Sequence, residues 1–215
     1  MTDNAKLFSD LGLSELPASL FIRSAEGLNE QPVRSHTHTL RRAWSSIPDL
    51  IGALCIGQRP HILFQSVGQS SAKITQKDHQ RFWNLGAASM LARVSDTEVR
   101  IYSALAIPAM GTADVDAEHR LIRTFDRATE TILLRGFLQS VVGGRAYEDY
   151  RSHFDPTQTV DRHLVENLGA ARILMSAGEE APPLAEIHKL LGRVLFICYL
   201  LTTARPSNCT NAESV

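Results

Sequence analysis

Cysteine is scarce in this chain and widely spaced. The three cysteines among 215 residues are Cys55, Cys198 and Cys209, and they form no CxxC pair. This spacing argues against a disulfide framework and against a cysteine-based zinc site. It favours a reducing compartment, and we expect a cytoplasmic protein.

The chain also lacks an excess of charge of either sign and lacks a long apolar run. Its 22 basic and 23 acidic side chains give a net charge of -1 at pH 7, whereas a dedicated nucleic-acid-binding domain is strongly basic. The N-terminal segment Met1–Gly12 has no basic region followed by an apolar core, which predicts no signal peptide. The most apolar window, 190–201, is shorter than the roughly 20 residues of a membrane span. We therefore expect no contact with a membrane.

The common catalytic signatures are missing as well. The sequence contains no H-E-x-x-H, no G-x-S-x-G and no Walker lysine loop. His36, His38 and His61 could suggest a metal site, but the H-x-H pair lies in a polar stretch, which favours solvated histidines, and no Glu, Asp or Cys stands at a helpful spacing. We predict no catalytic residue, no bound metal and no cofactor for this chain.

Short β-type runs and helical runs alternate in the first half of the chain. The runs 50–57 and 61–67 flank Gly57-Gln58-Arg59-Pro60, which predicts a hairpin. The runs 89–95 and 98–105 predict a second hairpin. Helices are expected at 6–13, at 39–47 with Thr39 as the N-cap, and at 77–87 with Gly86 near its end. The predicted fold class is α/β, with a small mixed four-stranded sheet and flanking helices, followed by a helical region.

The second half of the chain reads as helical. Apolar residues at three-to-four spacing predict one long helix over 116–140, a short helix at 145–153, and further helices at 160–176 and 184–202. The predicted organisation is a partly irregular N-terminal segment (1–38), an α/β domain (39–113), a helical domain (114–202) and a disordered tail (203–215).

Five arginines are candidates for DNA contact. Arg41 and Arg42 lie next to Trp44, and three more would share one stripe of the expected helix 116–140. The five are Arg41, Arg42, Arg120, Arg123 and Arg127. Acidic residues on the same predicted helix, among them Asp126 and Glu130, favour the alternative of a solvated, salt-bridged surface.

A metal-dependent nuclease would need an acidic residue at one strand and an E-x-K or D-x-K motif on the next, because the metal takes oxygen ligands. Asp49 precedes the first strand of the first hairpin, but the second strand offers Gln65 and Ser66 and no lysine two residues on. Any nuclease-like domain here is therefore expected to be inactive.

Several segments together resemble the N-terminal region of adenine-specific DNA methylases of restriction-modification systems, related to types I and IIG. They are TLRRAWSSIPDLIGALCIGQRPHILFQSV from Thr39, QRFWNLGAASMLARVSDTEVRIYSALAIPA from Gln80, FDPTQTVDRHLVENLGAARILM from Phe154, and IHKLLGRVLFICYL from Ile187. In that family the front domain is sometimes nuclease-like, and the last helix leads into the methyltransferase domain. The resemblance covers most of residues 39–201.

The chain departs from that family in its chemistry. It has neither a glycine-rich S-adenosylmethionine loop nor an N-P-P-Y or D-P-P-Y motif for a flipped adenine. It stops soon after Leu200, which suggests a truncated product or a split subunit. The expected function is a non-catalytic module that braces the methyltransferase domain or contacts DNA.

Three alternatives stay open. The first is a protein-interaction module without DNA contact, in which Leu195, Phe196, Tyr199 and Leu200 form an exposed interface. The second is a degenerate Mg²⁺-dependent nuclease that uses Asp49 or Glu98. The third is a truncated, non-functional fragment.

Overall fold

The computed structural model describes residues 3–17, 19–28, 37–57, 59–105, 120–177 and 181–203. The chain divides into two compact units, Met1–Val160 and Asp161–Val215. We call the first the sheet unit and the second the helical unit. Among the described residues, no helix combines the length and the apolar character needed to cross a bilayer.

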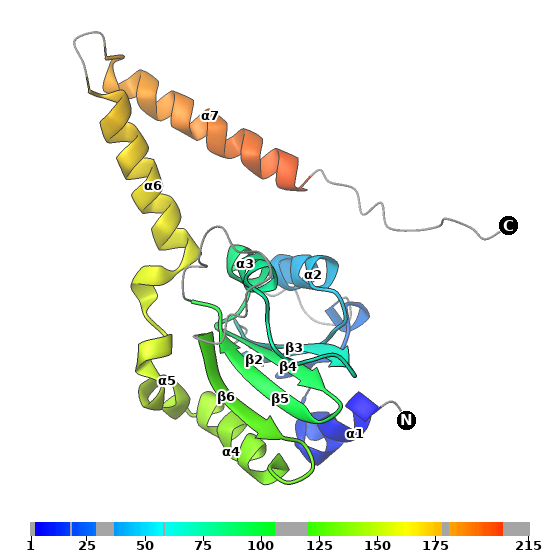
Figure 1. Ribbon diagram of the computed structural model, residues 1–215. Helices are drawn as coiled ribbons and strands as arrows, with labels where there is room; N and C mark the ends of the chain where they lie inside the picture. Colours follow the sequence, from blue (N-terminus) through cyan, green and yellow to red (C-terminus); the bar gives the residue numbers. More distant parts are fainter. Residues whose placement is uncertain are drawn as a thin grey trace, which may run out of the picture. The chain divides into compact units, whose positions relative to one another are not determined.

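The sheet unit is built on six strands, which lie side by side in the order of the sequence (Figure 1). They are β1 (Phe21–Ile22), β2 (Leu50–Ile56), β3 (Arg59–Gly68), β4 (Met90–Ser95), β5 (Glu98–Ser103) and β6 (Leu121–Asp126). All neighbouring pairs are antiparallel except β3 and β4, which are parallel. Helix α3 (Gln76–Leu85) connects these two strands, as parallel neighbours require.

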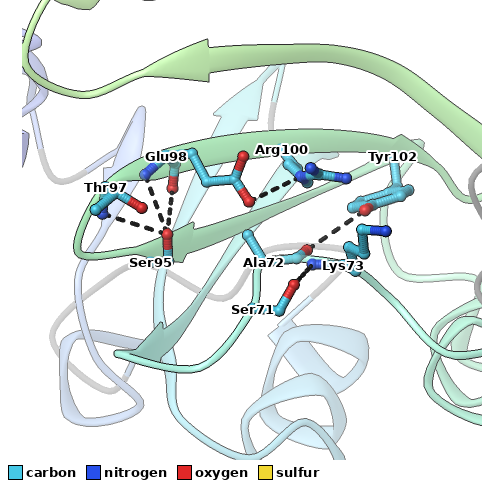
Figure 2. Close-up of polar contacts among 8 residues, drawn as sticks. All are labelled: Ser71, Ala72, Lys73, Ser95, Thr97, Glu98, Arg100 and Tyr102. Carbon is cyan, nitrogen blue, oxygen red and sulfur yellow. Dashed lines mark hydrogen bonds and ion pairs between the residues drawn. The ribbon is translucent and has the colours of Figure 1, made fainter.

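Both predicted hairpins are confirmed. Ile56 pairs with Arg59 at the first turn, where Gly57 has a φ of 55°. At the second turn, the Ser95 hydroxyl accepts hydrogen bonds from the backbone N–H groups of Thr97 and Glu98 (Figure 2). The Ser95 side chain thereby stabilises the turn between β4 and β5.

Helices cover both faces of the sheet. Figure 1 shows α2 (Thr37–Ser46) and α3 on one side, with α1 (Asp3–Asp10) and α4 (Thr131–Val142) on the other. Thr75 caps α3 by accepting a 3.2 Å hydrogen bond from the Asp78 N–H, and Gly86 ends it in the left-handed conformation. Because α2 begins at Thr37, Thr39 lies inside the helix and the predicted N-cap is wrong.

The prediction of a four-stranded sheet is wrong, although the α/β class holds. Strand β1 has only two residues, too few to show a period. Strand β6 lies in the segment predicted as one long helix, of which residues 116–119 are outside the described part. Ile122 and Phe125 fit a helical as well as a strand pattern, but Phe125 pairs with Val99 across the sheet.

Helix α4 begins at Thr131, after a turn in which the Asp126 carboxylate accepts hydrogen bonds from the Ala128 and Thr129 N–H groups.

Two apolar clusters fill the space between the sheet and its helices. On one face, Phe64 and Phe125 pack with Leu7 and Phe8 of α1 and Phe137 of α4. On the other, Leu63, Leu91 and Tyr102 pack with Leu40 of α2 and Phe82 of α3. Beyond α4, the chain continues through α5 (Arg145–Asp149) and short 3-10 turns at Arg151–His153 and Pro156–Gln158.

The described part of the helical unit consists of helices α6 (Val160–Met175) and α7 (Leu184–Thr203). They confirm the helices predicted at 160–176 and 184–202. The predicted disordered tail falls outside the described residues, except for Thr203, which ends α7.

Candidate functional site

A row of polar side chains crosses the face of the sheet that α2 and α3 cover. Gln65 of β3 pairs with Arg93 of β4, and Arg93 pairs with Arg100 of β5, so the three lie on neighbouring strands at one level. Gln65 and Arg93 are each only 8% exposed. The row lies near the carboxyl ends of the parallel strands β3 and β4, where α/β sheets commonly bind ligands.

Arg93 is the least satisfied charge of the row. Its Nη1 atom lies 3.6 Å from Oδ2 of Asp78 on α3, and neither Nη1 nor Nε makes a hydrogen bond. Burial lowers the pKa of Arg93, and the nearby Asp78 carboxylate opposes that effect. A buried guanidinium with donors left over is costly, because it has lost the water that solvated it.

Asp49 stands at the edge of the same row. Its neighbour Leu50 pairs with Gln65, and the Gln65 side-chain amide donates a 3.1 Å hydrogen bond to the Pro48 carbonyl. Asp49 has a φ of 53°, an uncommon value for a residue other than glycine, although aspartate tolerates it better than most. The fold therefore brings together Asp49 and Gln65, the two positions at which a nuclease would carry its acids.

The space beside this cluster is too small for a substrate. The cavity next to Gln65, Asp78 and Arg81 has a volume of about 10 Å³, which suits a single water molecule. Within the described part of the chain, no group of three His, Cys, Asp or Glu residues is placed to hold a metal ion. The arrangement can hold an ordered water between charges, and it offers no described set of ligands for metal-assisted cleavage.

Glu98 is engaged within the sheet. Its carboxylate accepts a 2.9 Å hydrogen bond from Nε of Arg100, and the Tyr102 hydroxyl on the same strand donates to the Ala72 carbonyl at 3.4 Å (Figure 2). Burial works to lower the pKa of Arg100, but hydrogen bonds to Glu98 and Tyr102 outweigh it and raise the pKa overall. Glu98 thus neutralises a partly buried arginine.

The structure does not place Arg120, Arg123 and Arg127 on a helical stripe, because they lie in and beside strand β6. The Arg123 guanidinium carbon lies 4.8 Å from the centre of the Phe125 ring, and Nη1 of Arg127 donates to the Ser95 carbonyl at 2.6 Å. Arg120 is half-buried, and burial lowers its pKa. All three contribute to local structure, and their contact with DNA stays a prediction.

Arg41 and Arg42 are placed differently from the other three arginines. Both side chains are exposed on α2, and Trp44 on the same helix is half-buried. Arg41 and Trp44 line a shallow hollow of about 430 Å³, together with Ala25, Glu26 and Ser45. This is the one predicted cationic pair that the described structure leaves open to solvent.

A network around His61 joins segments far apart in the sequence. The Tyr147 hydroxyl lies 2.5 Å from His61 Nδ1 and 2.7 Å from the Ser89 hydroxyl, which also donates to the His61 carbonyl. Burial and the charge of Arg59 lower the pKa of His61. His61 is therefore a half-buried residue that is hydrogen-bonded within the fold. His38 is exposed on α2, and His36 lies outside the described residues.

The helical unit exposes most of its large apolar side chains. Those at least 45% exposed are Leu164, Val165, Ile173, Leu174, Leu184, Leu190, Val194, Phe196 and Ile197. No described residue of α6 is buried, and Ile187 is the buried residue of α7 among its described side chains. Leu190, Val194 and Ile197 recur at spacings of four and three, so they form one stripe along α7, which we call the outer stripe.

The predicted interface lies on the same helix as the outer stripe but shares no residue with it. Phe196 is 60% exposed and Leu195 is half-buried. The side chains of Tyr199 and Leu200 lie outside the described part. Sequence reasoning did not single out the outer stripe, although its residues fall within the most apolar window of the chain.

Comparisons with protein-family models, with curated proteins and with solved structures give no match to this chain.

Proposed function

We propose that this chain is a non-catalytic module of an adenine DNA methyltransferase of a restriction-modification system, and that it braces the methyltransferase domain through α6 and α7. Two findings support this proposal. The segments between Thr39 and Leu200 resemble the region that precedes the methyltransferase domain in that family. In addition, α6 and α7 present apolar side chains that need a protein partner.

The observation that most strongly supports the proposal is the exposure of apolar side chains on the helical unit. Full burial of a valine, leucine, isoleucine or phenylalanine contributes about 1.5–3 kcal/mol. The outer stripe residues Leu190, Val194 and Ile197 are 47–53% exposed, so each retains roughly half of that amount for a partner. Helices with apolar side chains on several sides are ordinarily buried in a larger assembly.

The test is capture of the partner from the native host with a tagged full-length chain. The expected partner is a polypeptide that carries a glycine-rich S-adenosylmethionine loop and an N-P-P-Y or D-P-P-Y motif, identified by mass spectrometry. Val194→Glu together with Ile197→Glu should abolish the capture, because both charges would be buried at the interface.

Gly192→Glu is the matched control for charge on α7. A Cβ atom at Gly192 meets nothing within 4 Å, and helical spacing places this position on the side of α7 opposite the outer stripe. This variant should capture the methyltransferase as the unmodified chain does. Recovery of no polypeptide with these motifs, or equal recovery with all variants, would contradict the bracing role.

Contact with DNA is the second candidate function, and the exposed pair Arg41 and Arg42 beside Trp44 favours it. Binding of a labelled duplex across a salt series measures how many phosphates the chain contacts. Removing either arginine should reduce the salt slope by about one unit per lost phosphate contact. Arg123→Gln serves as the comparison, since Arg123 already lies over Phe125. No binding at low salt would remove this candidate.

A further inference from the structure

An aliphatic cleft opens in the sheet unit, away from the polar row. It lies between the segment that follows α1 and the helix α4, and Leu54 of β2 is among its lining residues. Its volume is about 400 Å³, within the roughly 300–1,000 Å³ of typical small-molecule sites. The apolar residues that line it are Leu11, Leu13, Leu16, Leu54, Leu138 and Val142.

This lining consists of aliphatic side chains, and most of it is rigid. Leu11, Leu13, Leu54 and Leu138 are all buried, so the sheet and helices fix their positions. Val142 is 53% exposed. Such a lining offers contact to an alkyl chain, and it includes no aromatic ring on which a planar ligand could stack.

Among the described residues that line the cleft, Arg135 is the cation. Arg135 of α4 donates from Nη2 to the carbonyl of Asp10, the last residue of α1. A Cβ atom at Gly12, which has a φ of 72°, would lie 3.6 Å from that nitrogen, so the guanidinium sits over the glycine. Arg135 forms no ion pair with any acidic side chain of the described residues, and four of its five N–H groups remain for a ligand.

We infer that this cleft binds a small aliphatic monocarboxylate, with the carboxylate on Arg135 and the alkyl chain among the leucines. A guanidinium recognises a carboxylate through two parallel hydrogen bonds. Gln139, which also lines the cleft, can donate a further hydrogen bond. Glu15 also lines the cleft, and its negative charge disfavours a second carboxylate on the ligand.

Calorimetric titration of the full chain with hexanoate and with hexylamine tests the inference. We expect saturable binding of hexanoate, and binding of hexylamine weaker by roughly tenfold or more, because the amine repels Arg135. Arg135→Gln should weaken hexanoate binding by roughly tenfold. Glu15→Gln should leave it unchanged or strengthen it, because a negative charge near the carboxylate is removed.

Val142→Trp is a second variant, which tests binding in the cleft independently in case Arg135→Gln disturbs the end of α1. Position 142 is half-exposed, so the larger side chain can occupy the cleft without entering the core. It should block hexanoate binding while the thermal melting temperature stays the same. The inference is overturned if hexanoate does not bind saturably, if hexylamine binds equally well, or if neither Arg135→Gln nor Val142→Trp weakens binding.

Discussion

The two units of this chain use apolar residues in opposite ways. Every residue of β4 is buried, whereas no described residue of α6 is. In the sheet unit, most of the apolar side chains pack in two buried clusters between the sheet and its helices. In the helical unit, side chains of the same types are exposed to solvent. The difference indicates that the sheet unit holds its own core, and it supports the proposal that another protein surface covers the helical unit.

Replacing one phenylalanine by alanine in each unit should give the largest difference in unfolding free energy between the two units. Phe64 is 0% exposed and Phe196 is 60% exposed. Phe64→Ala should lower the free energy of unfolding of the sheet unit by about 3–5 kcal/mol, because it leaves a cavity. Phe196→Ala should change it by less than about 0.5 kcal/mol. Urea unfolding monitored by circular dichroism measures both, and equal costs would contradict the comparison.

Substitution of a glycine should also destabilise the sheet unit but not the helical unit. The loss of stability should be smaller than for the phenylalanine substitution. A Cβ atom at Gly52 would lie 2.6 Å from Cζ of Phe21, whereas one at Gly192 meets nothing within 4 Å. Gly52→Ala should destabilise the sheet unit by about 1–3 kcal/mol through overpacking. Gly192→Ala should strengthen α7 by up to about 1 kcal/mol. Thermal melting with the far-ultraviolet signal reports both changes, and a neutral Gly52→Ala would show that β1 does not pack closely on β2.

Loss of the cap of α3 should cost less than the overpacking. Thr75→Ala removes the acceptor of the Asp78 N–H and should destabilise the sheet unit by about 1 kcal/mol. Thr75→Ser retains the hydroxyl and should restore most of that stability. If both variants unfold at the same urea concentration, the cap does not stabilise the helix.

The pH dependence of the unfolding free energy should arise from histidines of the sheet unit. We expect it to be smaller than the effects of the substitutions above. Burial and Arg59 lower the pKa of His61 below 6.5, so the folded state favours the neutral ring. Its contribution to stability is therefore complete above about pH 6.5 and is lost as the pH falls through the lowered pKa. Burial and Arg120 act on His153 in the same direction.

His61→Asn keeps a side-chain acceptor for Tyr147 and removes the titration. The difference in urea midpoint between pH 8 and pH 5.5 should shrink in this variant. An unchanged difference would assign the acid sensitivity to other groups.

Local patterns predicted the parts of the fold that depend on local chemistry. The first hairpin turn follows from its turn residues at Gly57, the second hairpin follows from its two β-type runs, and α3 follows from a helical run that Gly86 closes. Strand β6 could not be distinguished from a helix, because Ile122 and Phe125 satisfy both periods and only pairing with β5 decides between them. Strand β1 is fixed by its pairing with β2 and leaves no periodic signal.

The polar groups of the candidate site and of the His61 network were harder to predict from the sequence. Arg93 did leave a signal, because it is the one charged residue of the apolar strand Met90–Ser95. The contact of His61 with Tyr147 joins residues 86 positions apart, and no local pattern predicts it. The outer stripe of α7 has a regular period, but the sequence could not show which part of the apolar surface the chain itself covers.

Hydrogen exchange of the full chain, measured alone by mass spectrometry, tests most directly whether the helical unit lacks a core of its own. Protection of backbone amides follows the local free energy of opening. We expect strong protection in β3, β4 and β5 and rapid exchange throughout α6 and α7. Protection of α6 and α7 equal to that of β4 in the isolated chain would contradict it, because the helices would then need no partner.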